Sequence, residues 1–280
     1  MNIKIISDST CDLPKELLEK YNISIVPLTV IKDDEAFSDG VTITTDEIFA
    51  HVAAGGNLCS TAAVNMLDYQ EKFAEFADKY DAVFHINISS ELSSSYQNAS
   101  LAADEFDNVV AIDSRNLSTG QGLVVLKACE LAETAASVDE IKEKLINFTA
   151  KVESSFLIDR LDYMVKGGRC STVAALGANL LGLKPCIEVK DGKMSVVKKY
   201  RGNYAKSLAS YVKERLANRD DLDRKYLFVT HTPVSDDCAN AVEAAIAENA
   251  DFENTYWAKA GCTISCHCGP GTLGVLFAKK

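Results

Sequence analysis

The chain has 280 residues, of which 47% are hydrophobic and 25% are charged. This length and composition are typical of a globular protein with one large domain or two domains, and they exclude a disulfide-stapled miniprotein and a mostly disordered chain. With 29 Lys and Arg residues against 40 Asp and Glu residues, the formal net charge is −11. A nucleic acid is therefore not an expected partner.

Neither membrane insertion nor export is expected. The longest nearly apolar stretch, Val173–Leu183, has eleven residues, whereas a membrane-spanning helix needs about 20. The N-terminal residues Met1–Thr10 lack the long apolar region and the cleavage site of a signal peptide. We therefore expect a cytoplasmic protein without a transmembrane segment, whose nine cysteines are reduced thiols.

Short β-branched runs alternate with longer helical patterns in the first half of the chain, which predicts βαβ units and a mainly parallel sheet. Asp12 and Pro14 are placed to start a helix, and Ser137 and Glu140 have the spacing of a capping box. The predicted strands are 4–10, 23–31, 81–88 and 108–114, and the predicted helices are 13–21, 46–55, 64–80, 91–106, 117–135 and 137–152.

The pattern changes near residue 155, where we place a boundary between domains 1–155 and 156–280. Asp191-Gly192 lies between two strand-like runs, which is typical of a hairpin and predicts antiparallel pairing. No linker rich in Pro, Gly or Ser separates the halves, so they are expected to pack closely. The second domain is predicted to be α+β, with a hairpin at 184–200, helices at 203–219 and 235–250, and strands at 225–232, 255–261 and 272–278.

Three predicted strands end in hydroxyl-rich turns that open helices, at Ser9-Thr10, Ser89–Ser95 and Ser114–Thr119. Ser60-Thr61 is expected to precede a fourth helix. Such turns gather at the carboxyl edge of a parallel sheet, where the free N–H groups of helix N-termini attract an anion. The alternative is that these residues are ordinary helix caps.

Cys262, Cys266, His267 and Cys268 fall within seven residues, which is a combination that zinc can use. The spacing does not favour a metal, since no CxxC pair is present, and cytosolic cysteines often act as small buried hydrophobic residues. His267 directly precedes the turn sequence 268–271 and is expected at the end of a strand.

Two other kinds of site have weaker support. No glycine-rich nucleotide loop occurs, and Gly167-Gly168-Arg169 is either an anion-binding nest or a helix end. A serine hydrolase could assemble from Ser93, His267 and either Asp8 or Asp113. The GxSxG pattern of one hydrolase class is absent, however.

Six motifs together resemble the DegV family of fatty-acid-binding proteins from one end of the chain to the other. The resemblance implies two α/β domains, the first with a parallel sheet, that hold a long-chain fatty acid between them. It also implies that the protein is not itself an enzyme, because a separate fatty acid kinase, which binds ATP, converts the presented carboxylate to an acyl phosphate for phospholipid synthesis. The motifs are DSTCDLP (8–14), Ser60-Thr61, ISSELSSSYQNA (88–99), DSRNLSTGQG (113–122), LDYMVKGGR (161–169) and HCGPGTLGV (267–275).

By position, the resemblance implies that the hydroxyls of Thr61 and Ser93 hold the carboxylate and that His267 joins the same network. Arg169 and Arg201 match basic positions near the mouth of the site, which we associate with the kinase or the phosphate. No metal and no cofactor is implied. The segments 60–64 and 92–97 depart from the common family pattern beside these hydroxyls, so the shape of the pocket there is expected to differ.

A lipid ligand agrees with these residue types. Burying one methylene is worth about 0.8 kcal/mol, so roughly 15 of them contribute on the order of 12 kcal/mol before the costs of association. Neutral hydroxyls and a helix N-terminus then make it tolerable to desolvate the carboxylate. The nearly uncharged segment 176–189 is the candidate wall for the tail. The alternatives are a serine-dependent acyl hydrolase that uses Ser93 and His267, and a cysteine-based metal or redox sensor.

Overall fold

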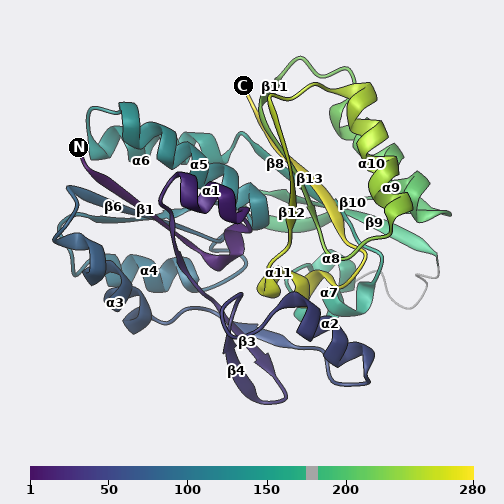
Figure 1. The fold of residues 1–280 in the computed structure, drawn as a ribbon, viewed down its shortest axis with the longest axis horizontal. Coiled ribbons are helices and arrows are strands. Elements are labelled where there is room, and N and C mark those ends of the chain that lie inside the picture. Colours follow the sequence, from purple (N-terminus) through teal and green to yellow (C-terminus); the bar gives the residue numbers. More distant parts are fainter. Residues whose placement is uncertain (175–181) are drawn as a thin grey trace.

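The computed structural model describes residues 1–174 and 182–280. The chain forms a parallel sheet, a larger mixed sheet and a small antiparallel sheet, with helices between and around them (Figure 1). The parallel sheet and the mixed sheet lie side by side, and the small sheet projects from their junction together with one helix (Figure 1). Within the described residues, no helix is long and apolar enough to cross a membrane.

The parallel sheet has the strand order β2-β1-β6-β7. Its apolar strands are covered on both faces, as parallel sheets usually are. Tyr69 and Phe73 belong to the core on one face, and Leu17 and Leu145 belong to the core on the other. The strands are β1 (Ile3–Asp8), β2 (Ser24–Val26), β6 (Ala82–Asn87) and β7 (Val109–Asp113), and the covering helices are α3 (Met66–Ala77) and α4 (Ser95–Ala103) on one side and α1 (Lys15–Lys20), α5 (Ser118–Thr134) and α6 (Val138–Thr149) on the other.

The mixed sheet has the strand order β10-β9-β8-β13-β11-β12 and is antiparallel except for the β11–β12 pair. Helices α9 (Tyr204–Leu216) and α10 (Asp236–Asn249) cover one of its faces. The predicted fold class, a parallel α/β part followed by an α+β part with antiparallel pairing, is confirmed. The strands are β8 (Val152–Leu157), β9 (Leu183–Lys190), β10 (Lys193–Arg201), β11 (Leu222–His231), β12 (Asn254–Lys259) and β13 (Leu273–Lys279).

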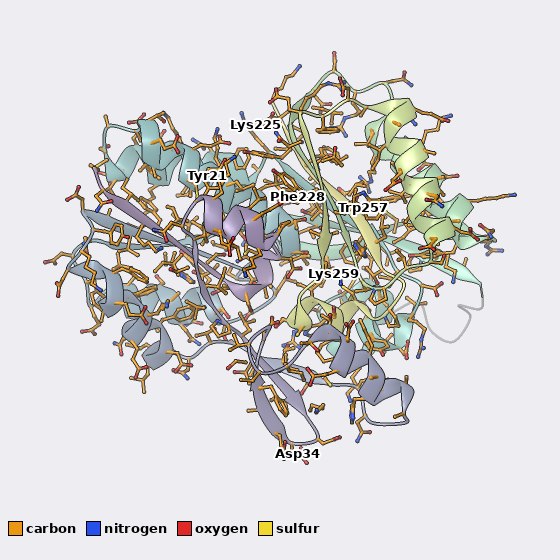
Figure 2. The ribbon with its side chains drawn as sticks, in the orientation of Figure 1. Tyr21, Asp34, Lys225, Phe228, Trp257 and Lys259 are labelled. Carbon is orange, nitrogen blue, oxygen red and sulfur yellow. The ribbon has the colours of Figure 1, made fainter. Side chains whose placement is uncertain are left out.

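Helix α5 lies between the parallel sheet and the mixed sheet and joins them in one core. Leu126 of this helix shares an apolar cluster with Phe84 of β6 and with Phe228 of β11, which Figure 2 labels. A helix with apolar residues around most of its circumference is expected only where both sides are covered. The two halves therefore pack closely, as expected. The predicted boundary near residue 155 falls within β8, and the division into two domains stays a prediction.

The third sheet, in the order β4-β3-β5, was not expected from the sequence. The predicted strand 23–31 is two strands in two different sheets, because Pro27 has no N–H for a continuous ladder and the chain turns there. The expectation that Ser60-Thr61 starts a helix is also wrong, since both residues pair with β3 and the helix starts only at Met66. The new elements are β3 (Thr29–Lys32), β4 (Glu35–Ser38), β5 (Ser60–Ala62) and α2 (Thr45–Ala53).

His267 lies on a helix and not at the end of a strand. The helix α11 (Cys262–Cys268) ends at Gly269, which has a positive φ of 72°, a conformation that glycine adopts without the strain of a Cβ. The turn signal at 268–271 was real, but it ends a helix. A short 3-10 helix, η1 (Ser9–Cys11), likewise replaces the end of the first predicted strand. The remaining short helices are α7 (Leu161–Gly167) and α8 (Ser171–Ala174).

Candidate functional site

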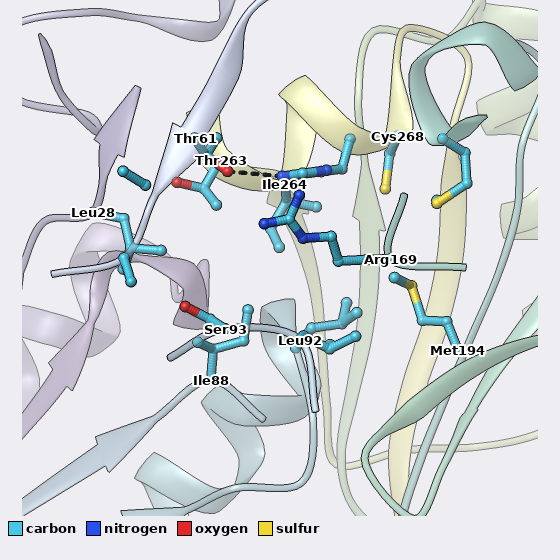
Figure 3. Close-up of a pocket in the computed structure, with 15 residues that line it drawn as sticks. Leu28, Thr61, Ile88, Leu92, Ser93, Arg169, Met194, Thr263, Ile264 and Cys268 are labelled. Atoms are coloured by element: carbon cyan, nitrogen blue, oxygen red, sulfur yellow. Dashed lines mark hydrogen bonds between the residues drawn. The ribbon is translucent and has the colours of Figure 1, made fainter. Parts of the chain in front are cut away.

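A pocket with about 550 Å³ of empty space, counted together with its solvent-filled mouth, lies where β5, α7, α11 and the turn after β6 meet (Figure 3). Its wall is mostly apolar, with a small group of polar side chains, which is the usual composition of a small-molecule site. The polar side chains come from Thr61, Ser93, Arg169, Thr263 and His267, and the apolar ones from Leu28, Ala62, Ala63, Ile88, Leu92, Leu117, Met164, Met194, Ile264 and Cys268.

Thr61 and His267 form a hydrogen bond across the pocket wall, with 2.8 Å between Thr61 Oγ1 and His267 Nε2. Thr61 comes from β5, and His267 comes from the last turn of α11. Burial, together with a smaller contribution from the positive charge of Arg169, lowers the pKa of His267 to about 4. The imidazole is therefore neutral near pH 7 and carries one ring proton.

The backbone of α7 fixes the other edge of this ring. A Cβ at Gly167 would lie only 2.3 Å from His267 Nδ1, so any side chain there would displace the imidazole. His267 Nδ1 is buried and has no hydrogen-bond partner among the described residues. A lone pair is cheaper to leave without a partner than an N–H group. This environment favours the tautomer in which Nε2 carries the proton and donates to Thr61.

Ser93 faces the pocket from the turn between β6 and α4 (Figure 3). Its Oγ accepts a hydrogen bond from the Ser95 backbone N–H, at 3.2 Å, and lies 2.9 Å from Ser95 Oγ. The start of this turn is held by Asp8, whose buried carboxylate accepts the Ile88 N–H at 3.0 Å. The predicted hydroxyl-rich turn is therefore present and leads into a helix.

Arg169 follows α7, and its side chain reaches toward the Thr61–His267 pair (Figure 3). The guanidinium donates to the Gly167 carbonyl at 2.7 Å and remains exposed. Arg201 lies at the exposed end of β10 and does not line the pocket. The structure thus brings Thr61, Ser93, His267 and Arg169 together and leaves Arg201 outside.

Thr263, which was not predicted as a site residue, lines the same pocket. Thr263 and His267 are four residues apart, and this spacing places two side chains on one face of a helix. This spacing was present in the sequence, but the segment was interpreted as a strand, in which the four-residue spacing does not indicate a helix face.

A second cavity, with about 310 Å³ of empty space, adjoins the first. Leu117, Ile264 and Cys268 line both cavities. The second cavity extends from these three residues toward Phe156 and Leu276 in the core beside the mixed sheet. Its surface is almost entirely apolar, although Ser118, Thr230, His231, Thr232 and Thr272 are also among its lining residues. The pocket thus has a polar end near Thr61 and an apolar end near these core residues.

The predicted wall for the ligand tail, at 176–189, lies only partly within the described residues. Residues 175–181 lie outside the part of the chain that the structure describes. Ile187 and Val189 of β9 are buried in the same apolar cluster as the pocket residues Met194 and Ile264. They support the wall from behind, but neither lines the pocket itself.

The structure does not favour the hydrolase. His267 bonds to Thr61, and Ser93 bonds to Ser95, and no hydrogen bond joins Ser93 to His267. The carboxylate of Asp8 bonds to His85 at 2.9 Å, and that of Asp113 accepts backbone N–H groups. A histidine with a pKa of about 4 is also a weak general base at neutral pH.

The clustered cysteines face different surroundings. Cys262 and Cys266 pack with Cys59, whereas Cys268 lies in the cluster beside the pocket. Burial raises the pKa of Cys262 and of Cys268 to about 12, and a protonated thiol is a poor metal ligand. Within the described residues, no group of three or more His, Cys, Asp and Glu side chains is placed to hold a metal ion.

Two aspartates from the N-terminal part of the chain bind the start of α11. Asp12 accepts the Gly261 N–H at 2.9 Å and the Ser118 hydroxyl at 2.5 Å. Asp39 accepts the Cys262 N–H at 2.9 Å. These contacts hold α11 in place, and with it the side chain of His267.

We expect Asp12→Asn to make the stability of the ligand-free protein less dependent on pH. Burial raises the pKa of Asp12 to about 8, above the usual aspartate value of 3.8, so the folded state keeps a proton that the unfolded state releases. This stabilisation is complete below pH 3.8 and is lost as the pH rises through about 8, at about 1.4 kcal/mol per pH unit.

The measurement is denaturant unfolding of both proteins between pH 6.5 and 8. This range lies above the ordinary pKa of histidine, so the lowered pKa of His267 does not contribute. Asn keeps the acceptor for the Gly261 N–H and tolerates the left-handed backbone at position 12. Equal pH slopes for the two proteins would show that Asp12 is already ionised in the folded state.

The fold and the pocket together define an α/β protein with an apolar ligand pocket that ends in a cluster of hydroxyls, an arginine and a neutral histidine. The chain belongs to the DegV family, because the family model described as "Uncharacterised protein, DegV family" matches residues 2–280. The resemblance that the six motifs suggested is thereby confirmed.

The relatives span the whole chain. A DegV domain-containing protein of Clostridium acetobutylicum is 34% identical over 99% of both chains. Among solved structures, a fatty-acid-binding DegV family protein from Thermus thermophilus covers 100% of both chains at 29% identity, with a TM-score of 0.92. A stearic acid-binding protein from Eubacterium ventriosum is 28% identical, with a TM-score of 0.84, and the match covers 99% of this chain and 98% of that chain.

Proposed function

We propose that this protein binds one long-chain fatty acid, with the carboxylate at the hydroxyl cluster and the tail in the apolar end of the pocket. The observation that carries the proposal is the composition of the pocket, which is apolar except for hydroxyls, one arginine and one neutral histidine at one end. Relatives of the same fold that bind fatty acids, in Thermus thermophilus and Eubacterium ventriosum, support it.

The carboxylate head group would be bound through a short chain of hydrogen bonds. His267 Nε2–H donates to Thr61 Oγ1, which leaves the Thr61 hydroxyl proton free for a ligand oxygen. Ser93 Oγ accepts the Ser95 N–H, and when Ser95 Oγ is the donor in the 2.9 Å pair of hydroxyls, the proton of Ser93 is likewise available. Hydrogen bonds to an ionised acceptor are roughly twice as strong as neutral ones. Arg169 supplies the positive charge that balances a carboxylate at this end.

The tail would supply most of the affinity. Each buried methylene contributes about 0.8 kcal/mol, and the apolar wall continues from the first cavity into the second through Leu117, Ile264 and Cys268. A tail that leaves the hydroxyl cluster in this direction stays out of water along its length. This arrangement favours a long chain over a short one.

We further propose that the protein presents its ligand to a separate fatty acid kinase in the cytoplasm, which phosphorylates the carboxylate to an acyl phosphate. The exposed guanidinium of Arg169 places the polar end of the pocket near solvent, where a second protein can reach it. In this proposal ATP is bound by the kinase, and this chain is a binding subunit without catalytic activity. Arg201, which is exposed on β10, remains a candidate contact for that partner.

The first test is whether the protein purified from a heterologous host carries about one equivalent of long-chain fatty acid. We expect it to, because an apolar pocket left empty forfeits its contacts. Native mass spectrometry followed by solvent extraction identifies the ligand. Absence of lipid, together with no affinity for added palmitate or oleate, would refute the proposed function. A hydrolase would instead release acid from ester substrates with turnover.

A further inference from the structure

Thr263 carries a buried hydroxyl that has no hydrogen-bond partner in the described part of the chain. The side chain is 4% exposed and lines the pocket. Figure 3 shows it beside Thr61, on the polar side of the pocket. A buried hydroxyl without a partner is costly, and native structures rarely leave one unexplained.

The local structure does not satisfy this hydroxyl. Thr263 is in the first turn of α11, and its backbone N–H is already bound to Asp39 at 3.2 Å. Ser265, two residues along, donates its buried hydroxyl to the Ala260 carbonyl, which lies just before the helix. Among the described residues, Thr263 has the only buried hydroxyl that lacks a partner, and Thr263 lines the ligand pocket.

We propose that Thr263 donates a third hydroxyl hydrogen bond to the ligand carboxylate, beside those of Thr61 and Ser93, and so makes the pocket selective for a free acid. This inference rests on the fatty acid binding proposed above. An ionised carboxylate has about four lone-pair sites and accepts from several donors at once, whereas an alcohol of the same chain offers one small neutral oxygen. A third donor therefore favours the acid more than the alcohol.

The test compares two ligands that share a C16 chain, palmitate and 1-hexadecanol, by titration of the wild type, Thr263→Val and Thr263→Ser. Val has nearly the shape of Thr without the hydroxyl, and Ser keeps the hydroxyl. We expect Thr263→Val to lose about 10- to 100-fold in affinity for palmitate and less than about threefold for the alcohol. Thr263→Ser should stay within about threefold of the wild type for both ligands.

The melting temperature of the ligand-free protein is the second readout. Since Val removes a buried polar group without a partner, Thr263→Val should melt no lower than the wild type. If that variant fails to fold, Thr263→Ala provides the same comparison of ligands.

Equal losses for acid and alcohol, or no loss for either, would refute the role of Thr263 while leaving fatty acid binding intact. A wild-type protein that binds neither ligand would refute both proposals.

Discussion

Replacing Cys268 with Phe is expected to lower the affinity for palmitate by about 1000-fold and to change the affinity for octanoate less than about threefold. Cys268 lines both cavities and is 5% exposed. A phenyl ring there would fill the passage, which is the space beside Cys268 where the two cavities adjoin. The ring would exclude the distal methylenes from the second cavity. Loss of five buried methylenes at about 0.8 kcal/mol each amounts to about 4 kcal/mol, which corresponds to about 1000-fold in affinity.

The experiment is a chain-length series from octanoate to stearate, titrated into folded wild type and variant. Cys268→Ala, which leaves the passage open, should bind the whole series nearly as the wild type does. Cys238→Phe is the matched control for overpacking, because Cys238 is buried in the separate cluster between α10 and the mixed sheet. An equal loss for every chain length would show that the tail does not pass Cys268.

Ser93→Ala is expected to weaken fatty acid binding about 10- to 100-fold and to slow acyl phosphate formation by a further factor of about 100. The substitution removes one hydrogen bond to a charged group, typically about 1.5–3 kcal/mol, while the burial of the tail remains. Phosphoryl transfer should suffer more, because misplacement of a nucleophile by about 1 Å can cost roughly 100-fold.

The two effects are measured on the same folded variant, by titration calorimetry with palmitate and by a kinase-coupled assay of acyl phosphate. Ser94→Ala is the matched control, since Ser94 is the exposed neighbour and makes no side-chain cap for α4. Thr61→Ala and His267→Ala should show milder losses than Ser93→Ala. If Ser93→Ala were as active as the wild type, the head group would bind elsewhere.

Local patterns in the sequence were sufficient to predict most helices and strands. The β-branched runs at β6 and β7 and the Asp191-Gly192 hairpin appear as predicted. These elements depend on periodicity and turn chemistry within a few residues, which the sequence displays directly. Ser137 likewise caps α6 by accepting the Glu140 N–H at 3.2 Å.

The errors lie where distant parts of the chain override local preference. Ser60 and Thr61 look like helix caps, but their backbone pairs with β3, thirty residues earlier. The segment at α11 looks strand-like because of its alternating cysteines, but Asp12 and Asp39 bind its first N–H groups and stabilise a helix. A carboxylate such as that of Asp39 near a helix N-terminus is favourable for its dipole, and no local pattern shows that Asp12 and Asp39 come so close.

The sequence by itself determined the family, the α/β class, and the hydroxyl, imidazole and guanidinium groups that the site uses. Only the tertiary structure decided which of these groups meet. It joins Thr61 to His267 across 206 positions of the chain, brings Arg169 but not Arg201 to the pocket, and leaves the Thr263 hydroxyl without a partner. The physical reason is the distance along the chain over which each effect acts. Capping and periodicity act over about four residues, whereas a binding site is formed by side chains that packing brings together from distant segments.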